Sequence, residues 1–183
     1  SLYGTATVGW KDMIYVDGSV RNDWSSSLPS GNNSYLYYSL SGSLVFTEFD
    51  FFDNQNFLTF GKIRASIAQV GDDIDAYSVN PTYNIGTPYV ASPSLTVPNT
   101  LVNTDLRPAI SSDYEFGLDT RYLGGDVRLD ITYYNSVRED EILNLNVPGS
   151  SGYERVTINA GEFVSKGWEA QLGATVLQTS DFL

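Results

Sequence analysis

The sequence predicts an all-β fold: a partial antiparallel transmembrane β-barrel of about seven strands. Apolar and polar residues alternate along several stretches, and the connections between those stretches are alternately short and long. No apolar run approaches the ~20 residues that a membrane helix needs. Because successive side chains on a strand point to opposite faces, the alternation describes strands with one apolar and one wet face.

The alternation places each expected strand. The clearest runs from Tyr114 to Tyr122, where apolar residues or Thr take every second position between charged residues and Gly. At ~3.3 Å per residue and a tilt of ~40°, this stretch forms a band roughly 20 Å tall between two aromatic positions. The full set of expected strands is 2–10, 13–21, 35–46, 58–70, 112–122, 127–147 and 154–176.

The connections predict which ends of the strands meet. Lys11-Asp12 and the segment around Gly124-Gly125 are tight, and adjacent glycines suit a two-residue hairpin because both can take positive φ. Residues 47–57 form a connection of medium length, and a further turn is expected at 178–181. Residues 22–34, 71–111 and 148–153 form longer connections, which carry all of the Pro and about half of the Ser and Asn. Short turns at one rim and long loops at the other are typical of transmembrane barrels.

The alternation also assigns each side chain to a face. The apolar side is expected to contact lipid and the other side to line a hydrated lumen. The residues expected to face lipid are Tyr38, Leu40, Leu44, Phe116, Leu118, Tyr122, Leu129, Ile131, Tyr133, Trp168 and Leu172. Those expected to face the lumen are Asp17, Ser19, Arg21, Lys62, Arg64, Glu115, Asp119, Arg121, Arg128, Asp130 and Glu169.

Composition excludes several classes of function. The chain has no Cys and no His, which removes disulfides, thiol nucleophiles and the Ser-His-Asp triad. A net charge of −12 argues against nucleic-acid binding, which needs clustered Lys and Arg. Carboxylates such as those at 139–141 could suggest a glycosidase pair, but charged inner faces are ordinary in barrels. We therefore expect no enzymatic activity and no cofactor.

The longest connection holds the remaining candidate residues. Asp72, Asp73 and Asp75 are weak candidates for calcium, because their spacing does not match an EF-hand loop and a solvated acidic loop explains them. No metal is expected. Tyr77, Tyr83 and Tyr89 could stack on sugar rings, although loop packing or contact with a lid protein explains them equally well.

Ordered motifs cover nearly the whole chain. They begin with Gly18-Ser19-Val20-Arg21-Asn22-Asp23 and Lys62-Ile63-Arg64-Ala65-Ser66. Six further motifs follow in this order: Leu106-Arg107-Pro108, Tyr114-Glu115-Phe116-Gly117-Leu118, Leu129-Asp130-Ile131-Thr132-Tyr133-Tyr134, Gly152-Tyr153, Ile158-Asn159-Ala160-Gly161-Glu162 and Lys166-Gly167-Trp168-Glu169. The run resembles the C-terminal barrel region of the SusC/RagA family of TonB-dependent outer-membrane transporters of Bacteroidetes. Ala109 and Ser165 depart from the residues usual in that family.

The resemblance implies a large barrel of about twenty-two strands, plugged by an N-terminal domain. It implies TonB-dependent import of a bulky nutrient, an oligosaccharide or a peptide, across the outer membrane of a Gram-negative, Bacteroidetes-like cell. The implied partners are outer-membrane lipid, a SusD-like surface lipoprotein, TonB through the plug region, and the rest of the barrel. Residues 1–183 are then expected to be a fragment of the barrel domain without the plug.

Two alternatives remain open from the sequence. The chain could be a small self-contained outer-membrane barrel of about eight strands, for which its length would suffice. It could also be a soluble carbohydrate-binding β-sandwich, because a sheet with one buried face gives the same alternation.

Overall fold

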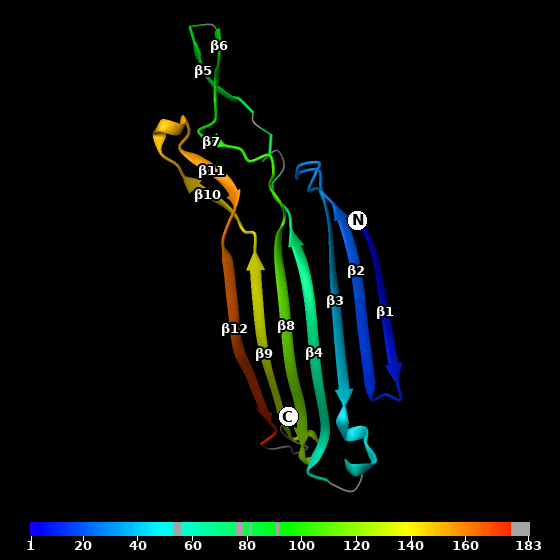
Figure 1. Cartoon of the computed structure of the whole chain (residues 1–183). Helices are drawn as coiled ribbons and strands as arrows, with labels where there is room; N and C mark the ends of the chain where they lie inside the picture. The colour runs from blue at the N-terminus through cyan, green and yellow to red at the C-terminus, as the bar shows by residue number, and fades with distance from the viewer. Residues whose placement is uncertain (53–55, 76–78, 81, 91, 177–183) are drawn as a thin grey trace.

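The computed structural model describes residues 1–52, 56–75, 79–80, 82–90 and 92–176. Its main feature is one antiparallel sheet of seven long strands, each paired with the next along the chain (Figure 1). The strands follow the order β1 (Leu2–Trp10), β2 (Ile14–Trp24), β3 (Ser34–Val45), β4 (Leu58–Asp72), β8 (Ala109–Tyr122), β9 (Val127–Glu139) and β12 (Glu162–Ala174).

The connections divide between the two ends of the sheet. Residues 11–13, 46–52, 56–57 and 123–126 lie at one end, called the turn end, which is at the bottom of Figure 1. Residues 25–33 and 140–161 lie at the opposite end, called the loop end, with the described residues of the connection between β4 and β8. The connection at 46–57 contains η1 (Phe46–Glu48) and η2 (Asp50–Phe52).

Both tight turns use left-handed backbone, which the sequence predicts for the glycine pair but not for Lys11 and Asp12. Lys11 and Asp12 have φ of 51° and 55°. In η3 (Leu123–Gly125), Gly124 and Gly125 have φ of 73° and 100°, and Leu123 is also left-handed. The prediction that the glycine pair supports a hairpin is confirmed.

The loop end carries two small sheets above the main one (Figure 1). In one, β10 (Ile142–Asn146) pairs antiparallel with β11 (Arg155–Asn159), and β11 pairs in parallel with β7 (Thr100–Leu101). The other is the hairpin of β5 (Asn84–Tyr89) and β6 (Ser92–Thr96), and η4 (Gly149–Ser151) joins β10 to β11. The connection expected at 71–111 therefore contains short strands that the sequence analysis did not predict.

The prediction of continuous strands at 127–147 and 154–176 is wrong. Each is broken near the same level, between β9 and β10 and between β11 and β12. Asp140 and Gly161 mark the breaks, with φ of 57° and 92°, values that a strand cannot accommodate. Beyond the breaks the two segments pair with each other in the separate sheet. The other expected strand ends differ by a few residues, and the turn expected at 178–181 lies outside the described residues.

No second layer covers the main sheet within the part of the chain that the structure describes (Figure 1). The buried apolar side chains are few, and Leu106 is the largest that is fully buried. The β-sandwich alternative is therefore wrong. Among the described residues β1 and β12 are opposite edges and do not pair, so the sheet is open. None of the described helices is long and apolar enough to span a membrane.

Candidate functional site

One face of the sheet carries nearly all of its charged side chains, and we call it the polar face. Residues directly opposite each other in an antiparallel pair share a face, so the register assigns every position. Ser41 lies opposite Asp17 and Ser66, and Ser66 lies opposite Glu115. The register places on this face all of the residues expected to line the lumen: Asp17, Ser19, Arg21, Lys62, Arg64, Glu115, Asp119, Arg121, Arg128, Asp130 and Glu169.

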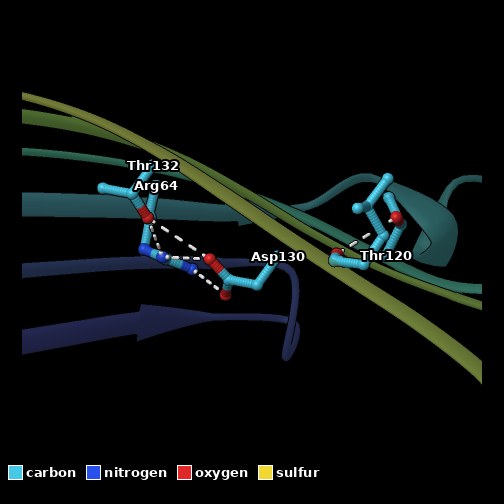
Figure 2. Close-up of polar contacts among 5 residues, drawn as sticks. Arg64, Thr120, Asp130 and Thr132 are labelled. Carbon is cyan, nitrogen blue, oxygen red and sulfur yellow. Dashed lines mark hydrogen bonds and ion pairs between the residues drawn. The ribbon is translucent and has the colours of Figure 1, made fainter. Parts of the chain in front are cut away.

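Arg64 forms the most extensive polar contact on this face (Figure 2). From β4 it donates hydrogen bonds to both carboxylate oxygens of Asp130 on β9, each at 2.8 Å. Its Nη2 also donates to the hydroxyl of Thr132 at 2.6 Å. The side chain crosses β8 over Gly117, where a Cβ atom would lie only 2.5 Å from Cζ of Arg64. Gly117 therefore leaves open the path by which Arg64 joins two strands that are not neighbours.

A second polar cluster lies on the same face towards the loop end. Nε of Arg21 donates to Asp23 at 2.9 Å, and the hydroxyl of Tyr37 donates to the same carboxylate. Further towards the turn end, Asp17 accepts a hydrogen bond from the Thr7 hydroxyl at 2.7 Å.

The opposite face is apolar, and we call it the apolar face. Phe116, Tyr133 and Trp168 form one row across β8, β9 and β12. Trp168 is 74% exposed and Leu172 is 72% exposed. All of the residues expected to face lipid lie here: Tyr38, Leu40, Leu44, Phe116, Leu118, Tyr122, Leu129, Ile131, Tyr133, Trp168 and Leu172. A continuous apolar surface across the sheet needs an apolar medium or partner to cover it.

The apolar face carries few polar groups: a threonine whose hydroxyl is hydrogen-bonded and three charged residues near the loop end. Thr120 is 3% exposed, and its hydroxyl donates to the carbonyl oxygen of Leu129 at 3.3 Å (Figure 2). The bond to the backbone satisfies the hydroxyl without water. Within the strands of the main sheet, the charged residues on this face are Glu139, Glu162 and Lys166, all in the half of β9 and β12 nearer the loop end.

A polar pocket of about 560 Å³ lies at the loop end, above the main sheet. Asp72, Asp73 and Asp75 are among its lining residues. Asp72 pairs with Arg138 at 2.5 Å, and Asp73 accepts a hydrogen bond from the Ser25 hydroxyl at 2.5 Å. Among the described residues, no cluster of acidic side chains could hold a metal ion. The three weak calcium candidates therefore line one pocket without forming such a cluster.

Of the three candidate tyrosines, Tyr83 is the one whose side chain the structure describes. Tyr83 is 67% exposed and does not line the polar pocket. Tyr77 lies outside the described residues, and for Tyr89, at the end of β5, only the backbone is described. Stacking on sugar rings stays a prediction. The pocket itself could not be predicted from the sequence, because the alternation does not indicate β7, β10 and β11, which surround it, as separate strands.

These features define a class of protein. The sheet is antiparallel and open, one face is apolar and uncovered, the other is charged, and the longest loops gather at one end. This combination is the wall of a transmembrane β-barrel.

Comparison with known proteins identifies the family. Residues 1–182 match the family described as TonB dependent receptor-like, beta-barrel, and the chain belongs to it. This is a family of outer-membrane receptors and transporters rather than of enzymes. The sequence is 27% identical to TonB-dependent receptor P26 of Formosa agariphila over 100% of this chain and 19% of the relative. For receptor P39 of the same organism the identity is 24%, over 100% of this chain and 18% of the relative. The chain thus spans about a fifth of the length of these relatives.

Solved structures show the same fold. The structure of the RagAB peptide transporter superposes with a TM-score of 0.87 at 24% identity, covering 98% of this chain and 20% of that one. The siderophore receptor PirA from Pseudomonas aeruginosa superposes with a TM-score of 0.63 at 16% identity, covering 93% of this chain and 30% of that one. The TonB-dependent receptor barrel inferred from the sequence motifs is confirmed, and the fold matches that of the RagAB transporter.

Proposed function

We propose that this chain forms part of the barrel wall of an outer-membrane, TonB-dependent importer of a bulky nutrient, an oligosaccharide or a peptide. The observation that carries the proposal is the separation of the two faces. The apolar face, from Leu40 on β3 to Leu172 on β12, contacts lipid, and the polar face lines a hydrated lumen. The loop end is then extracellular and the turn end periplasmic.

The rest of the transport machinery lies outside this chain in the proposal. The barrel is completed to about twenty-two strands, the lumen is plugged, and the plug region contacts TonB. A SusD-like lipoprotein covers the extracellular mouth. The structural likeness to the RagAB peptide transporter supports a peptide as one substrate class. The wall itself performs no catalysis.

The physical support comes from the outward side chains. Without lipid, each large side chain on the apolar face would be exposed to water. Exposure costs ~1.5–3 kcal/mol per side chain relative to burial in apolar surroundings. Tyr114 and Tyr122 bound the apolar stretch of β8, at the positions where amphipathic rings reach the two edges of the hydrocarbon layer. Lipid therefore explains both the exposed apolar area and its aromatic limits.

Single cysteines test the assignment of the faces. The chain has no native Cys, so once any Cys outside residues 1–183 is replaced, Ile131→Cys, Thr132→Cys, Gln171→Cys and Leu172→Cys can be spin-labelled one at a time in the full-length protein, in outer membranes. We expect labels at 131 and 172 to collide with oxygen dissolved in lipid, and labels at 132 and 171 to collide with a water-soluble nickel chelate. Leu123→Cys in the tight turn is the aqueous control. Equal accessibilities at neighbouring positions, or the reverse pattern, would contradict the proposal.

A further inference from the structure

Lys166 is the one basic residue on the apolar face within the strands of the main sheet. The register places it opposite Asn135, which in turn lies opposite Tyr114. Lys166 is exposed and makes no hydrogen bond or ion pair with any residue that the structure describes. The other two lysines differ: Nζ of Lys11 lies 4.9 Å from the centre of the Trp10 ring, and Lys62 is on the polar face opposite Asp119.

The position of Lys166 along β12 marks a boundary. Towards the turn end, the residues on the same face are Trp168, Ala170 and Leu172, which are all uncharged. Towards the loop end, the same face reaches the carboxylate of Glu162, four residues away and thus ~13 Å along the strand. Lys166 therefore lies between the apolar band and the first outward carboxylate. A lysine at such a level extends its ammonium group towards the membrane surface while its methylene stem stays in apolar surroundings.

Side chains with hydrogen-bond donors lie near Lys166 on this face, at its own level and towards the turn end. The rings of Tyr133 and Trp168 pack with centroids 5.0 Å apart, and Tyr114 lies one strand further along. The phenol and indole groups of these residues are donors that commonly occupy the interface of a membrane. The buried side-chain oxygen of Asn135 has no hydrogen-bond partner among the described atoms. The nearby carboxylates of Glu115 and Glu169 are on the polar face, so they do not neutralise Lys166.

We propose that Lys166, together with the donors of Tyr114, Tyr133 and Trp168, binds the phosphate of an anionic lipid headgroup in the outer leaflet. The inference rests on the proposed function, because it requires the apolar face to contact lipid. An ammonium group near hydrocarbon needs a counter-charge, and no described carboxylate forms an ion pair with Lys166. A lipid phosphate provides that charge at the level that Lys166 reaches, and its oxygens accept hydrogen bonds from the ring donors.

Lipid retention by the full-length protein tests the site. The protein is placed in nanodiscs of phosphatidylcholine containing bisphosphorylated lipid A, extracted into neutral detergent, and analysed for bound lipid by native mass spectrometry. A basic residue at an anionic membrane surface contributes ~1 kcal/mol, so we expect Lys166→Gln to lower lipid A retention about fivefold. Lys166→Arg keeps the charge and should retain lipid A as the unaltered protein does. Lys62→Gln, on the polar face, is the matched control and should change nothing.

The outcomes separate the site from the proposed function. If Lys166→Gln retains as much lipid A as the unaltered protein, the phosphate site is overturned, while the spin-label pattern still decides which face contacts lipid. If dephosphorylated lipid A shows the same dependence on Lys166, the headgroup chemistry is wrong. If the unaltered protein does not insert into nanodiscs at all, the proposed function fails and the lipid site fails with it.

Discussion

At the residue scale, the polar face is held by a contact that passes over a strand. Arg64 and Asp130 lie on β4 and β9, and β8 runs between them. Cross-strand contacts usually join immediate neighbours, so a bidentate pair across three strands needs a clear path. Gly117 lies opposite both Arg64 and Thr132 and supplies that path because it has no side chain. The contact ties three strands of the wall together on the side that we propose faces the lumen.

Gly117→Ala should disturb this contact. A Cβ at this position meets the Arg64 side chain, so the guanidinium moves and its two hydrogen bonds to Asp130 are weakened. The side chains of Arg64 and Asp130 are 35% and 37% exposed, which keeps the expected loss of unfolding free energy to about 1 kcal/mol or less. Thermal unfolding of the full-length protein in detergent measures it.

The matched control is Gly173→Ala, on the same face, where no neighbour lies within 4 Å of an added Cβ. It should be nearly neutral. Because Gly117→Ala and Asp130→Asn act on one contact, the double variant should lose less stability than the two single losses added together. Equal losses for Gly117→Ala and Gly173→Ala, or full additivity, would show that the contact does not stabilise the wall.

The sequence predicts the face of each residue but not this contact. Alternation with period two fixes the side on which Arg64 and Asp130 lie, because it depends only on neighbouring residues. Their pairing depends on the register of three strands and on a glycine in the middle one, and the two residues are 66 positions apart. Likewise, spacing alone could not show that Asp72 forms an ion pair with Arg138 instead of sharing a calcium ion with Asp73 and Asp75.

At the element scale, two left-handed residues divide the wall from the extracellular sheet in our proposal. Asp140 follows the last residue of β9, and Gly161 precedes the first residue of β12. The two breaks lie at the same level of the sheet, because Glu139 and Glu162 are paired. The breaks let β10 and β11 turn away from the wall, where β10 pairs with β11 and β11 pairs with β7. The consecutive charges at 139–141 indicate where the alternation weakens, but they do not predict the positive φ of Asp140. The strands β5 and β6 contain Pro88 and Pro93, residues that ordinarily indicate loops or edge strands.

Gly161→Ala should loosen the small sheet without affecting the wall. The nearest side-chain atom would be 3.6 Å from the added Cβ, so the cost comes from the backbone at φ 92°. That cost is ~1–2 kcal/mol for a residue with a Cβ in left-handed backbone. Hydrogen exchange should become faster at the amides of β10 and β11 and stay unchanged at the centres of β8 and β9.

Gly149→Ala in the same region is the control for Gly161→Ala. Gly149 has no positive φ, and nothing lies within 4 Å of an added Cβ. Hydrogen exchange in β10 and β11 should therefore stay as in the unaltered protein. A uniform change in exchange across β8, β9, β10 and β11 in Gly161→Ala would mean that the small sheet and the wall unfold as one unit.

At the scale of the whole molecule, the two free edges of the sheet determine whether the wall can stand alone. In the described residues, β1 exposes one edge along Leu2–Trp10 and β12 exposes the other along Glu162–Ala174. In hydrocarbon every unpaired backbone group costs several kcal/mol, so barrels close and leave no edge. The sequence predicts seven strands with one apolar face, but closure depends on what lies beside β1 and β12.

Residues 1–183 expressed alone should therefore fail to form a stable barrel. We expect the isolated polypeptide to aggregate in detergent and to show no compact band that converts to a slower one on heating. The full-length protein, run beside it, should show that conversion, because its edges are paired. A heat-modifiable, detergent-stable monomer of residues 1–183 would instead require β1 and β12 to close on each other, directly or through the residues after 176. That result would support a small self-contained barrel and would remove the need for further strands in the proposed wall.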